Sequence, residues 1–373
     1  MARGDRSILP GALFFTLTEY AVVSADLERD RQVIIDLWHQ NLVDIDQLEE
    51  KYDWHFLDNP FGLGQIWILT ADGHAVGTTS LAIRPLRVRG TDTTAGMAGD
   101  LAVNKDHRFL QPALTLQRAL MSSAHVGIRM LYGVPNPSAA SVMKYVGYRE
   151  FCPIHRYAKA LKMSHYLQRS GKLGAMAPII GKIADQGLAA WQSIGWRQGR
   201  LGTQVLHSFD ERFDELWGRL SSSQATLTIR NRKFLQWRYR DCPLRQYKTV
   251  GLLTDDDSRL LGYLIYYVEA NSAVCADLLA LGGAENLDCL LSFWAAQASD
   301  DGLASLSVSC SDEALADTLK RQGFSQRSIV SASKPGRASR QERSKTLFTY
   351  DRHASSEPPI AASWYYTDGD SLY

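Results

Sequence analysis

The order of apolar and polar positions in the first part of the chain predicts alternating strands and helices. Ala113, Leu116 and Leu120 recur at spacings of three and four, which places them on one face of a helix. Asp72-Gly73 separates two apolar runs and is typical of a hairpin turn. The predicted strands are 19–24, 65–70, 75–83, 93–103, 129–134 and a last one from 148, and the predicted helices are 31–40, 46–56, 112–125 and 138–146. This order is typical of an α/β layered fold.

Two stretches of the chain repeat one another. Residues 54–60 (WHFLDNP) and 237–243 (WRYRDCP) share Trp, an aromatic residue, Asp and Pro at identical spacing, with an offset of 183 residues. A Leu-Trp pair in a helical pattern precedes each heptad, and a strand, an acidic turn and a second strand follow it. One heptad can match by chance, but a whole order of elements indicates a duplicated unit.

Composition and charge narrow the classes of protein. The chain has 373 residues, 45% of them apolar and 22% charged, which excludes a mostly disordered or fibrous protein and fits two domains. Lys and Arg number 41 and Asp and Glu 40, so the net charge is +1 and a nucleic-acid partner held by bulk positive charge is not expected.

Cysteines and apolar runs indicate the compartment. The five cysteines include no Cys-x-x-Cys pair, and Cys152 with His155 makes too small a set for zinc, so we expect no disulfide framework and no metal. The apolar run at residues 8–15 is short and is interrupted by Pro10, which argues against a signal peptide. No run approaches the roughly 20 apolar residues of a membrane span. We therefore predict a cytoplasmic protein.

Residues 100–113 (DLAVNKDHRFLQPA) join the end of a predicted strand to the start of a predicted helix. A helix N-terminus leaves backbone N–H groups free, and its dipole attracts anions such as a pyrophosphate. Arg108 brings a positive charge to this loop and Ala113 a small side chain. The stretch resembles the cofactor motif R/Q-x-x-G-x-G/A of the GNAT acyltransferase superfamily, with Gln111 in place of the first glycine.

A second stretch resembles the same superfamily. The run NPSAASVMKYVGY from Asn136 is similar to its pattern N-x-x-A-x-x-x-Y-x-x-x-G-[FY], with Ala139, Gly147 and Tyr148 at matching positions. Met143 replaces the tyrosine that in the family often protonates the departing thiolate. A thiolate with a pKa of about 8.5 can leave without that help. The chain is also similar to a bacterial GNAT-like subgroup that often accompanies exopolysaccharide genes.

The resemblance implies a fold, a cofactor and a set of cofactor-binding residues. It implies two tandem GNAT-like domains, each a mixed, mostly antiparallel sheet flanked by helices, with acetyl-CoA or another acyl-CoA as the acyl donor and no metal. The residues that it assigns to acyl-CoA are Leu101, Ala102, Val103, His107, Arg108, Phe109, Leu110, Gln111, Pro112, Ala113 and Asn136.

The duplication and the resemblance together divide the chain. We predict an acyl-CoA-binding domain at 1–160, a helical bridging segment at 161–206, a degenerate GNAT-like domain at 207–335, and a basic loop with an aromatic tail at 336–373. The tail contains Trp364, Tyr365 and Tyr366, so we expect it to dock onto a domain rather than to extend into solvent.

Asp100, at the end of the strand beside the cofactor motif, is the candidate proton acceptor. An amine substrate arrives as an ammonium and loses a proton before it attacks a thioester, and a carboxylate whose pKa is raised by burial can accept that proton. Two other interpretations stay open: Asp100 binds the backbone of a loop, or His107 takes the proton.

The second copy lacks the cofactor motif. After its third strand comes Gly282-Gly283, which we interpret as a tight turn, and Glu285 would place negative charge at the helix start where a pyrophosphate would bind. The second copy is therefore expected to be non-catalytic and to complete the substrate cleft. Trp54 and Trp237 occur in both copies, so we assign them to packing rather than to ligand binding.

The function that these observations favour is acyl-CoA-dependent transfer of an acyl group to an amine, with a small molecule or a glycan as the acceptor and an amino sugar as the hypothesis. Two alternatives stay open. One is a Fem-type transferase that uses aminoacyl-tRNA, against which the near-zero net charge argues. The other is a non-catalytic GNAT-like binding or scaffold protein, for which Gln111 and Met143 argue.

Overall fold

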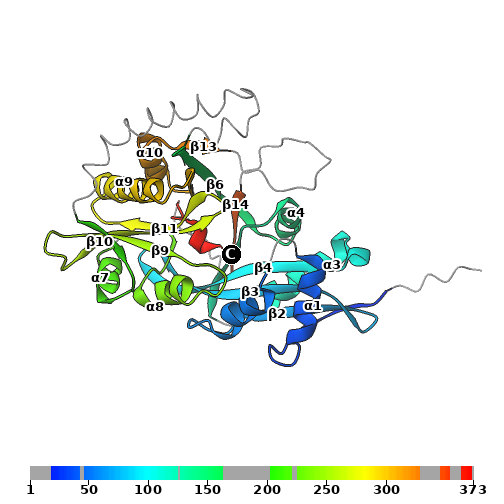
Figure 1. The fold of residues 1–373 in the computed structure, drawn as a ribbon. Coiled ribbons are helices and arrows are strands. Elements are labelled where there is room, and N and C mark those ends of the chain that lie inside the picture. The colour runs from blue at the N-terminus through cyan, green and yellow to red at the C-terminus, as the bar shows by residue number, and fades with distance from the viewer. Residues whose placement is uncertain are drawn as a thin grey trace, which may run out of the picture.

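The computed structural model describes residues 18–42, 46–124, 127–162, 202–220, 225–327, 345–352 and 363–371. They form two lobes, one from the blue and cyan N-terminal elements and one from the green and yellow C-terminal elements (Figure 1). The strands of both lobes join into one 14-stranded sheet with the order β1-β2-β3-β4-β5-β14-β6-β12-β11-β10-β9-β7, to which β13 and β8 add at β6 and β3.

The N-terminal lobe contains every element that the sequence pattern predicts for it. Its strands are β1 (Tyr20–Ser24), β2 (Gln65–Ala71), β3 (His74–Val88), β4 (Thr91–Val103), β5 (Ile128–Gly133) and β6 (Arg149–Ala160). Its helices are α1 (Arg31–Asn41), α2 (Leu48–Tyr52), the π-helix η1 (Asp53–Leu57), the 3-10 helix η2 (Lys105–His107), α3 (Leu110–Ser123) and α4 (Pro137–Tyr145). The helix expected at 46–56 is α2 continued by η1.

Helices cover both faces of the N-terminal sheet. Because successive side chains of a strand point to opposite faces, β2 contributes to two cores. Ile66 and Ile68 pack with α1 and α2, whereas Trp67 and Leu69 pack with α3 and α4. This arrangement explains why the strand has an unbroken run of apolar residues rather than an alternating pattern.

The C-terminal lobe repeats this plan. Its strands are β7 (Thr203–Leu206), β9 (Lys248–Leu253), β10 (Leu260–Glu269), β11 (Ser272–Ala280), β12 (Ser305–Cys310) and β13 (Ser325–Arg327). Two further strands of this part of the chain, β8 (Leu227–Thr228) and β14 (Lys345–Asp351), pair with strands of the N-terminal sheet. Its helices are α7 (Glu211–Arg219), α8 (Arg232–Leu235), the π-helix η4 (Gln236–Arg240), α9 (Ala284–Asp300), α10 (Glu313–Arg321) and the 3-10 helix η5 (Asp368–Asp370).

Again the first two helices, α7 and α8, cover one face of the sheet, and α9 and α10 cover the other. Each lobe is thus a mixed, mostly antiparallel sheet flanked by helices, as predicted.

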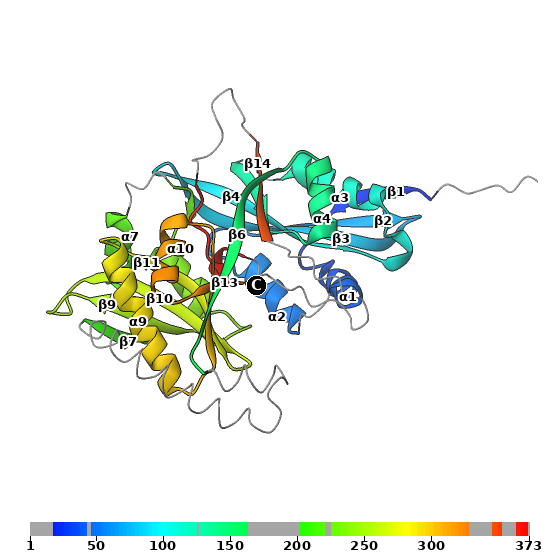
Figure 2. The ribbon, with the colours of Figure 1, turned by 90° about the horizontal axis from the view of Figure 1, so that it is seen from above.

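Two strands cross between the lobes. The first half of β6 pairs with β14 in the N-terminal sheet, and its second half, from His155 to Ala160, pairs with β12 in the C-terminal sheet. β14, which follows the C-terminal lobe in the chain, inserts between β5 and β6 and pairs antiparallel with both. Figure 2 shows β6 passing from one lobe into the other, with the orange β14 beside it. The N-terminal sheet is therefore completed by residues that the sequence places more than 180 positions later.

The aromatic tail is buried between the lobes, as expected. Trp364 and Tyr366 are each 1% exposed and pack into the core under α1 and α2. A fully buried ion-pair network holds the same segment, since Arg230 donates to Asp370 Oδ2 at 2.8 Å and to Asp277 Oδ1 at 2.9 Å. The tail is thus part of the contact between the lobes.

Some predictions fall outside the described residues. The helices expected in the bridging segment, the apolar run near the start and most of the basic loop lie in ranges 1–17, 163–201 and 328–344. Among the helices that the described ranges contain, none is long and apolar enough to cross a membrane.

Candidate functional site

The candidate site begins where β4 and β5 separate. Their parallel pairing runs from Thr94 and Ile128 to Met97 and Tyr132. β5 then ends at Gly133, whereas β4 continues to Val103 and pairs there with β3 alone among the described strands. The last residues of β4 consequently present backbone N–H and C=O groups along an edge that no other described strand covers.

Asp100 lies in this part of β4, inside a β-bulge and with a positive φ of 46°. Its Oδ1 accepts a hydrogen bond from Lys51 Nζ at 2.5 Å, and its Oδ2 accepts one from Ser80 Oγ at 2.7 Å. The side chains of Asp100 and Lys51 have no exposed surface. Burial lowers the pKa of Lys51 from its ordinary value, and Asp100 opposes that effect. A positive φ at a residue other than glycine is a strained conformation that is enriched at functional sites.

The loop after β4 is tied to the end of α1. Arg108 donates from Nε to the carbonyl oxygen of Val103 at 2.7 Å and from Nη2 to Asn41 Oδ1 at 2.8 Å. Asn41 in turn donates to Asn104 Oδ1 at 2.7 Å. Arg108 therefore carries a charge at the loop surface and also fixes the shape of the loop.

His107 and Phe109 anchor the same loop on β1. His107 Nδ1 lies 2.7 Å from the hydroxyl of Tyr20, and the rings of Tyr20 and Phe109 meet edge to face with centroids 6.0 Å apart. Phe109 and Leu110 are nevertheless about half exposed, at 51% and 48%. The hydrogen bond to Tyr20 gives His107 a structural partner.

The helix α3 begins directly after this loop. Leu110, Gln111 and Pro112 are its first three residues, and its cap, Phe109, makes no side-chain hydrogen bond to the helix. Gln111 has an ordinary helical backbone and an exposed side chain, so the position that is glycine in the resembled motif needs no positive φ here. The first amides of an α-helix have no intrahelical acceptor, which leaves them available to an anion.

Asn136 and Met143 lie on α4, at the neighbouring strand end. The Oδ1 of Asn136 accepts from the backbone N–H of Ala139 at 2.9 Å and so caps α4. Met143 is buried and fills the space above Gly133, where an added β-carbon would come within 3.3 Å of its Cε. Gly147 has a φ of 105° and follows the last turn of α4, the left-handed position that favours glycine.

The structure brings the predicted residues together at one sheet edge. β4 and β5 run parallel, so the loop after β4 and Asn136 after β5 lie at the same end of the sheet. Leu101, Ala102 and Val103 form the uncovered strand edge, and Pro112 and Ala113 the first turn of α3. No sequence pattern marks Lys51, Ser80 and Asn41, because each contacts the site from an element distant in sequence and none belongs to a local motif.

The corresponding position of the C-terminal lobe differs. Gly282 and Gly283 have φ values of 74° and 76°, as a tight turn requires. Glu285 lies in the first turn of α9, where its carboxylate would repel a phosphate group. Across all described residues, no group of three or more His, Cys, Asp or Glu side chains is placed to hold a metal ion.

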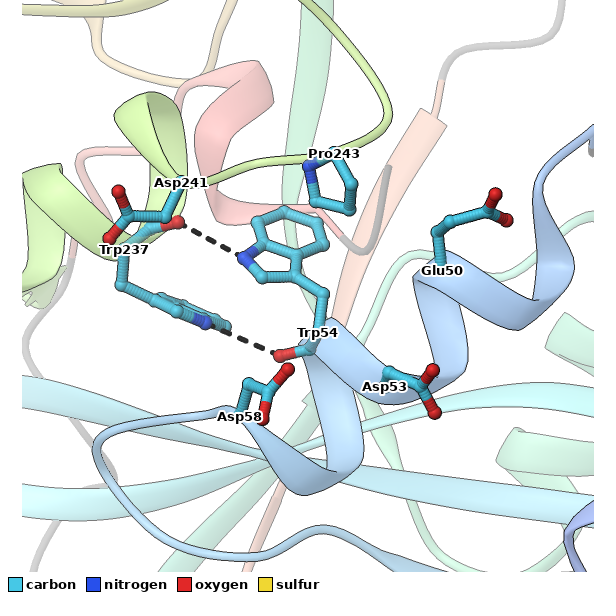
Figure 3. A pocket seen from close by; sticks show the side chains of 7 residues that line it. All are labelled: Glu50, Asp53, Trp54, Asp58, Trp237, Asp241 and Pro243. Carbon is cyan, nitrogen blue, oxygen red and sulfur yellow. Dashed lines mark hydrogen bonds between the residues drawn. The ribbon is translucent and has the colours of Figure 1, made fainter.

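Trp54 and Trp237 pack against each other between the lobes. Each indole Nε1 donates to the other residue's carbonyl oxygen, at 3.0 Å and 3.3 Å, and the ring centroids are 5.2 Å apart. Figure 3 shows this reciprocal pair and its two hydrogen bonds. The two Trp residues line a cavity of about 370 Å³ that is also lined by four carboxylates, those of Glu50, Asp53, Asp58 and Asp241. The two heptads of the sequence repeat form this contact, so the assignment of both Trp residues to packing agrees with the structure.

Comparison with solved structures identifies the fold. The chain is similar to a probable N-acyltransferase from Enterococcus faecalis V583, with a TM-score of 0.61 and 11% identity over 90% of this chain and 73% of that chain. It is also similar to a tandem GNAT protein from the clavulanic acid biosynthesis pathway, with a TM-score of 0.52 and 13% identity over 91% of this chain and 100% of that chain.

A third similar structure is the GCN5-related glucosamine N-acetyltransferase region of a fungal multi-domain GH3 β-N-acetylglucosaminidase. Its TM-score is 0.53, with 11% identity over 90% of this chain and 38% of that chain. No model of a protein family matches the sequence, and no curated protein does either. At these identities the similarities establish the fold, which is that of two GNAT domains in tandem.

Proposed function

We propose that the N-terminal lobe binds acetyl-CoA or another acyl-CoA and transfers the acyl group to an amine. The observation that carries this proposal is the uncovered edge of β4 directly beside the first turn of α3. The edge offers backbone hydrogen bonds to an extended chain such as a pantetheine arm, and the helix start offers amides and a dipole to a pyrophosphate. Arg108 adds positive charge to the same loop.

The proposed chemistry is proton removal followed by attack on a thioester. The acyl-CoA supplies the thioester, and the amine nitrogen forms the new amide bond as the carbon–sulfur bond breaks. Asp100 is the proposed acceptor of the ammonium proton: the hydroxyl of Ser80 accepts that proton and passes its own to Asp100 Oδ2, to which it is hydrogen-bonded, while Lys51 stays protonated. Without a tyrosine at position 143, solvent protonates the departing thiolate.

The C-terminal lobe is proposed to shape the acceptor side of the site. β8 pairs with β3, and the tail packs against Tyr132 of β5 through Trp364, with ring centroids 5.0 Å apart. The contact of Trp364 with Tyr132 lies in the core under α1 and α2, whereas β8 extends the sheet at the end of β3. An amino sugar is the proposed acceptor, supported by the glucosamine N-acetyltransferase region among the similar structures. We propose that the protein acts in the cytoplasm.

Isothermal titration with acetyl-CoA tests the proposal. The expected result is measurable binding that Arg108→Glu abolishes, because an anion beside the phosphates repels them. Arg118→Glu is the matched control, since Arg118 is exposed on the same helix, α3, away from its start. Asn41→Ala removes the hydrogen bond from Arg108 to Asn41 but keeps the charge of Arg108. It is therefore expected to weaken acetyl-CoA binding less than Arg108→Glu does. No heat from the wild type at millimolar acetyl-CoA would refute the proposal.

Kinetics with glucosamine test the chemical step. Asp100→Asn is expected to lower kcat by about a hundredfold or more while acetyl-CoA affinity stays within about threefold. Equal losses of kcat and of acetyl-CoA affinity would argue that Asp100 only maintains the shape of β4.

A further inference from the structure

The C-terminal lobe contains a second cavity that the proposed reaction does not use. Its volume is about 480 Å³, within the range of small-molecule sites. It lies where β7 ends and β9 begins, between η4 and the last turns of α9. The Gly282-Gly283 turn follows β11, and β11 runs in the same direction as β9 because both are antiparallel to β10. The cavity is therefore at the end of the sheet opposite to the position that corresponds to the acyl-CoA motif.

The charges of this cavity are all of one sign. Arg240, Arg245 and Lys248 line it, and no Asp or Glu does. The chain as a whole has 41 basic and 40 acidic residues, so the excess of positive charge is local to this cavity. Lys248 pairs with Asp301 at 2.9 Å, whereas no ion pair within 4.0 Å is formed by Arg240 or Arg245 within the described ranges. Arg240 Nη1 donates to the carbonyl oxygen of His207 at 3.1 Å, and Arg245 interacts electrostatically with Asp368. The remaining N–H groups of the two guanidinium groups can donate to an anion.

The interior of the cavity is aromatic. Tyr239 and Tyr266 are 3% and 1% exposed and form buried walls. Tyr239 meets Tyr247 edge to face with centroids 5.1 Å apart, and Arg245 stacks on the neighbouring Tyr267 at 4.5 Å. Aromatic walls below a cationic rim suit a ligand with a planar apolar body and an anionic group.

We propose that this cavity binds a small planar organic anion, a carboxylate or a phosphate ester. Nucleic acid fits poorly, because a few cations in a chain of net charge +1 give little electrostatic affinity for a polyanion. The chain's own segment 163–201 fits poorly too, since it contains five Lys and Arg residues and one Asp. The site is separate from the proposed acyltransferase site and does not depend on that function.

Isothermal titration calorimetry of the full chain with 1-naphthyl phosphate at low salt tests the site. We expect sub-millimolar binding that weakens about tenfold for Arg245→Gln and for Arg240→Gln, each of which removes one charge-assisted contact. Arg259→Gln is the control, because Arg259 is exposed on the turn between β9 and β10 and does not line the cavity. Uncharged 1-naphthol is expected to bind at least about tenfold more weakly.

Several results would overturn the site. They are no heat at millimolar 1-naphthyl phosphate, equal affinity for 1-naphthol, and an equal loss for Arg259→Gln. Displacement of the probe by saturating acetyl-CoA in the wild type but not in Arg108→Glu would also overturn it, because the probe would then share the acyl-CoA site. If acetyl-CoA itself fails to bind, the acyltransferase proposal falls while the naphthyl phosphate result still decides this one.

Discussion

At the scale of single residues, the pair of Lys51 and Asp100 is the most constrained feature of the candidate site. Both side chains are fully buried and their charged atoms are 2.5 Å apart. Removal of one partner leaves an uncompensated charge, so Lys51→Met is expected to lower the free energy of unfolding by about 3–5 kcal/mol. Asp100→Asn keeps a residue that tolerates the positive φ and retains a hydrogen bond to Ser80.

The double variant Lys51→Met, Asp100→Asn is expected to cost clearly less than the sum of the two single changes, since it removes both charges. Urea unfolding of the four proteins measures this coupling. Additive costs would show that the two side chains do not act as an ion pair.

A buried amine elsewhere makes the stability depend on pH. Lys159 is 7% exposed, its Nζ lies 5.9 Å from the ring centroid of Phe324, and among the described residues no carboxylate pairs with it. Burial lowers the pKa of Lys159 from 10.5 to about 8. Between these values the unfolded chain binds the proton and the folded chain does not, so stability rises with pH across this window and the full penalty applies below pH 8.

Lys159→Met should therefore stabilise the protein at pH 7 by roughly 1–3 kcal/mol, an advantage that disappears above the pKa of a free lysine, about 10.4. Urea unfolding between pH 6 and pH 11 measures it. An advantage that is independent of pH would attribute the effect to packing rather than to charge.

The position of a residue in the fold could be predicted where the signal was local. Arg108 and Ala113 belong to one short motif, and the motif lies where a strand meets a helix, as its spacing predicts. Lys51 and Ser80 reach Asp100 from α2 and β3, and no pattern within either segment marks them. Their role follows from tertiary packing, which a single sequence does not encode in any local period.

At the scale of elements, β14 also could not be predicted from a local sequence pattern. The hydrophobic period predicts the strands and most helices of the N-terminal lobe, because each buries one face or stripe against a neighbour. Residues 345–351 fall in what the sequence indicates as a tail, yet they form a central strand of the N-terminal sheet. The partner strands of β14 precede it by about 190 residues or more, and pairing at that distance leaves no trace in a local pattern.

The position of β14 gives a prediction for this strand. Leu347 has no exposed surface and packs with the core under α1 and α2, whereas Lys345 on the same strand is exposed. Leu347→Asp buries an unpaired charge and is expected to abolish folding or to cost more than about 4 kcal/mol. Lys345→Asp is expected to change stability by about 0.5 kcal/mol or less.

Thermal unfolding of the two variants, with purified full-length chains, distinguishes these outcomes. A Leu347→Asp protein as stable as Lys345→Asp would show that β14 is not needed to complete the N-terminal sheet.

At the scale of the whole molecule, the sequence repeat becomes an interface. The first four residues of each heptad lie in a π-helix, η1 or η4, and Trp54 and Trp237 from these π-helices contact each other across the lobes. Their reciprocal Trp contacts are those of a pseudo-two-fold interface, in which the same patch of each copy contacts the other. The duplication could be predicted from sequence, but the direct contact of its two copies could not.

This contact predicts strong coupling between the lobes. Trp54→Ala and Trp237→Ala each remove a buried indole and are expected to cost about 3–5 kcal/mol. Each single change already removes the contact between the two indoles. The free-energy cost of the double variant should therefore be smaller than the sum of the two single costs by roughly 0.5–3 kcal/mol. Trp294, a buried residue of α9 in a different core, is the matched control.

Trp54→Ala combined with Trp294→Ala should be additive, since these residues belong to different cores. Guanidinium unfolding, followed by circular dichroism, provides the four free energies of each cycle. Equal coupling energies in both cycles would mean that the loss of stability is transmitted through the whole sheet. A coupling energy found only for Trp54 with Trp237 would show that the repeated heptad itself holds the two lobes together.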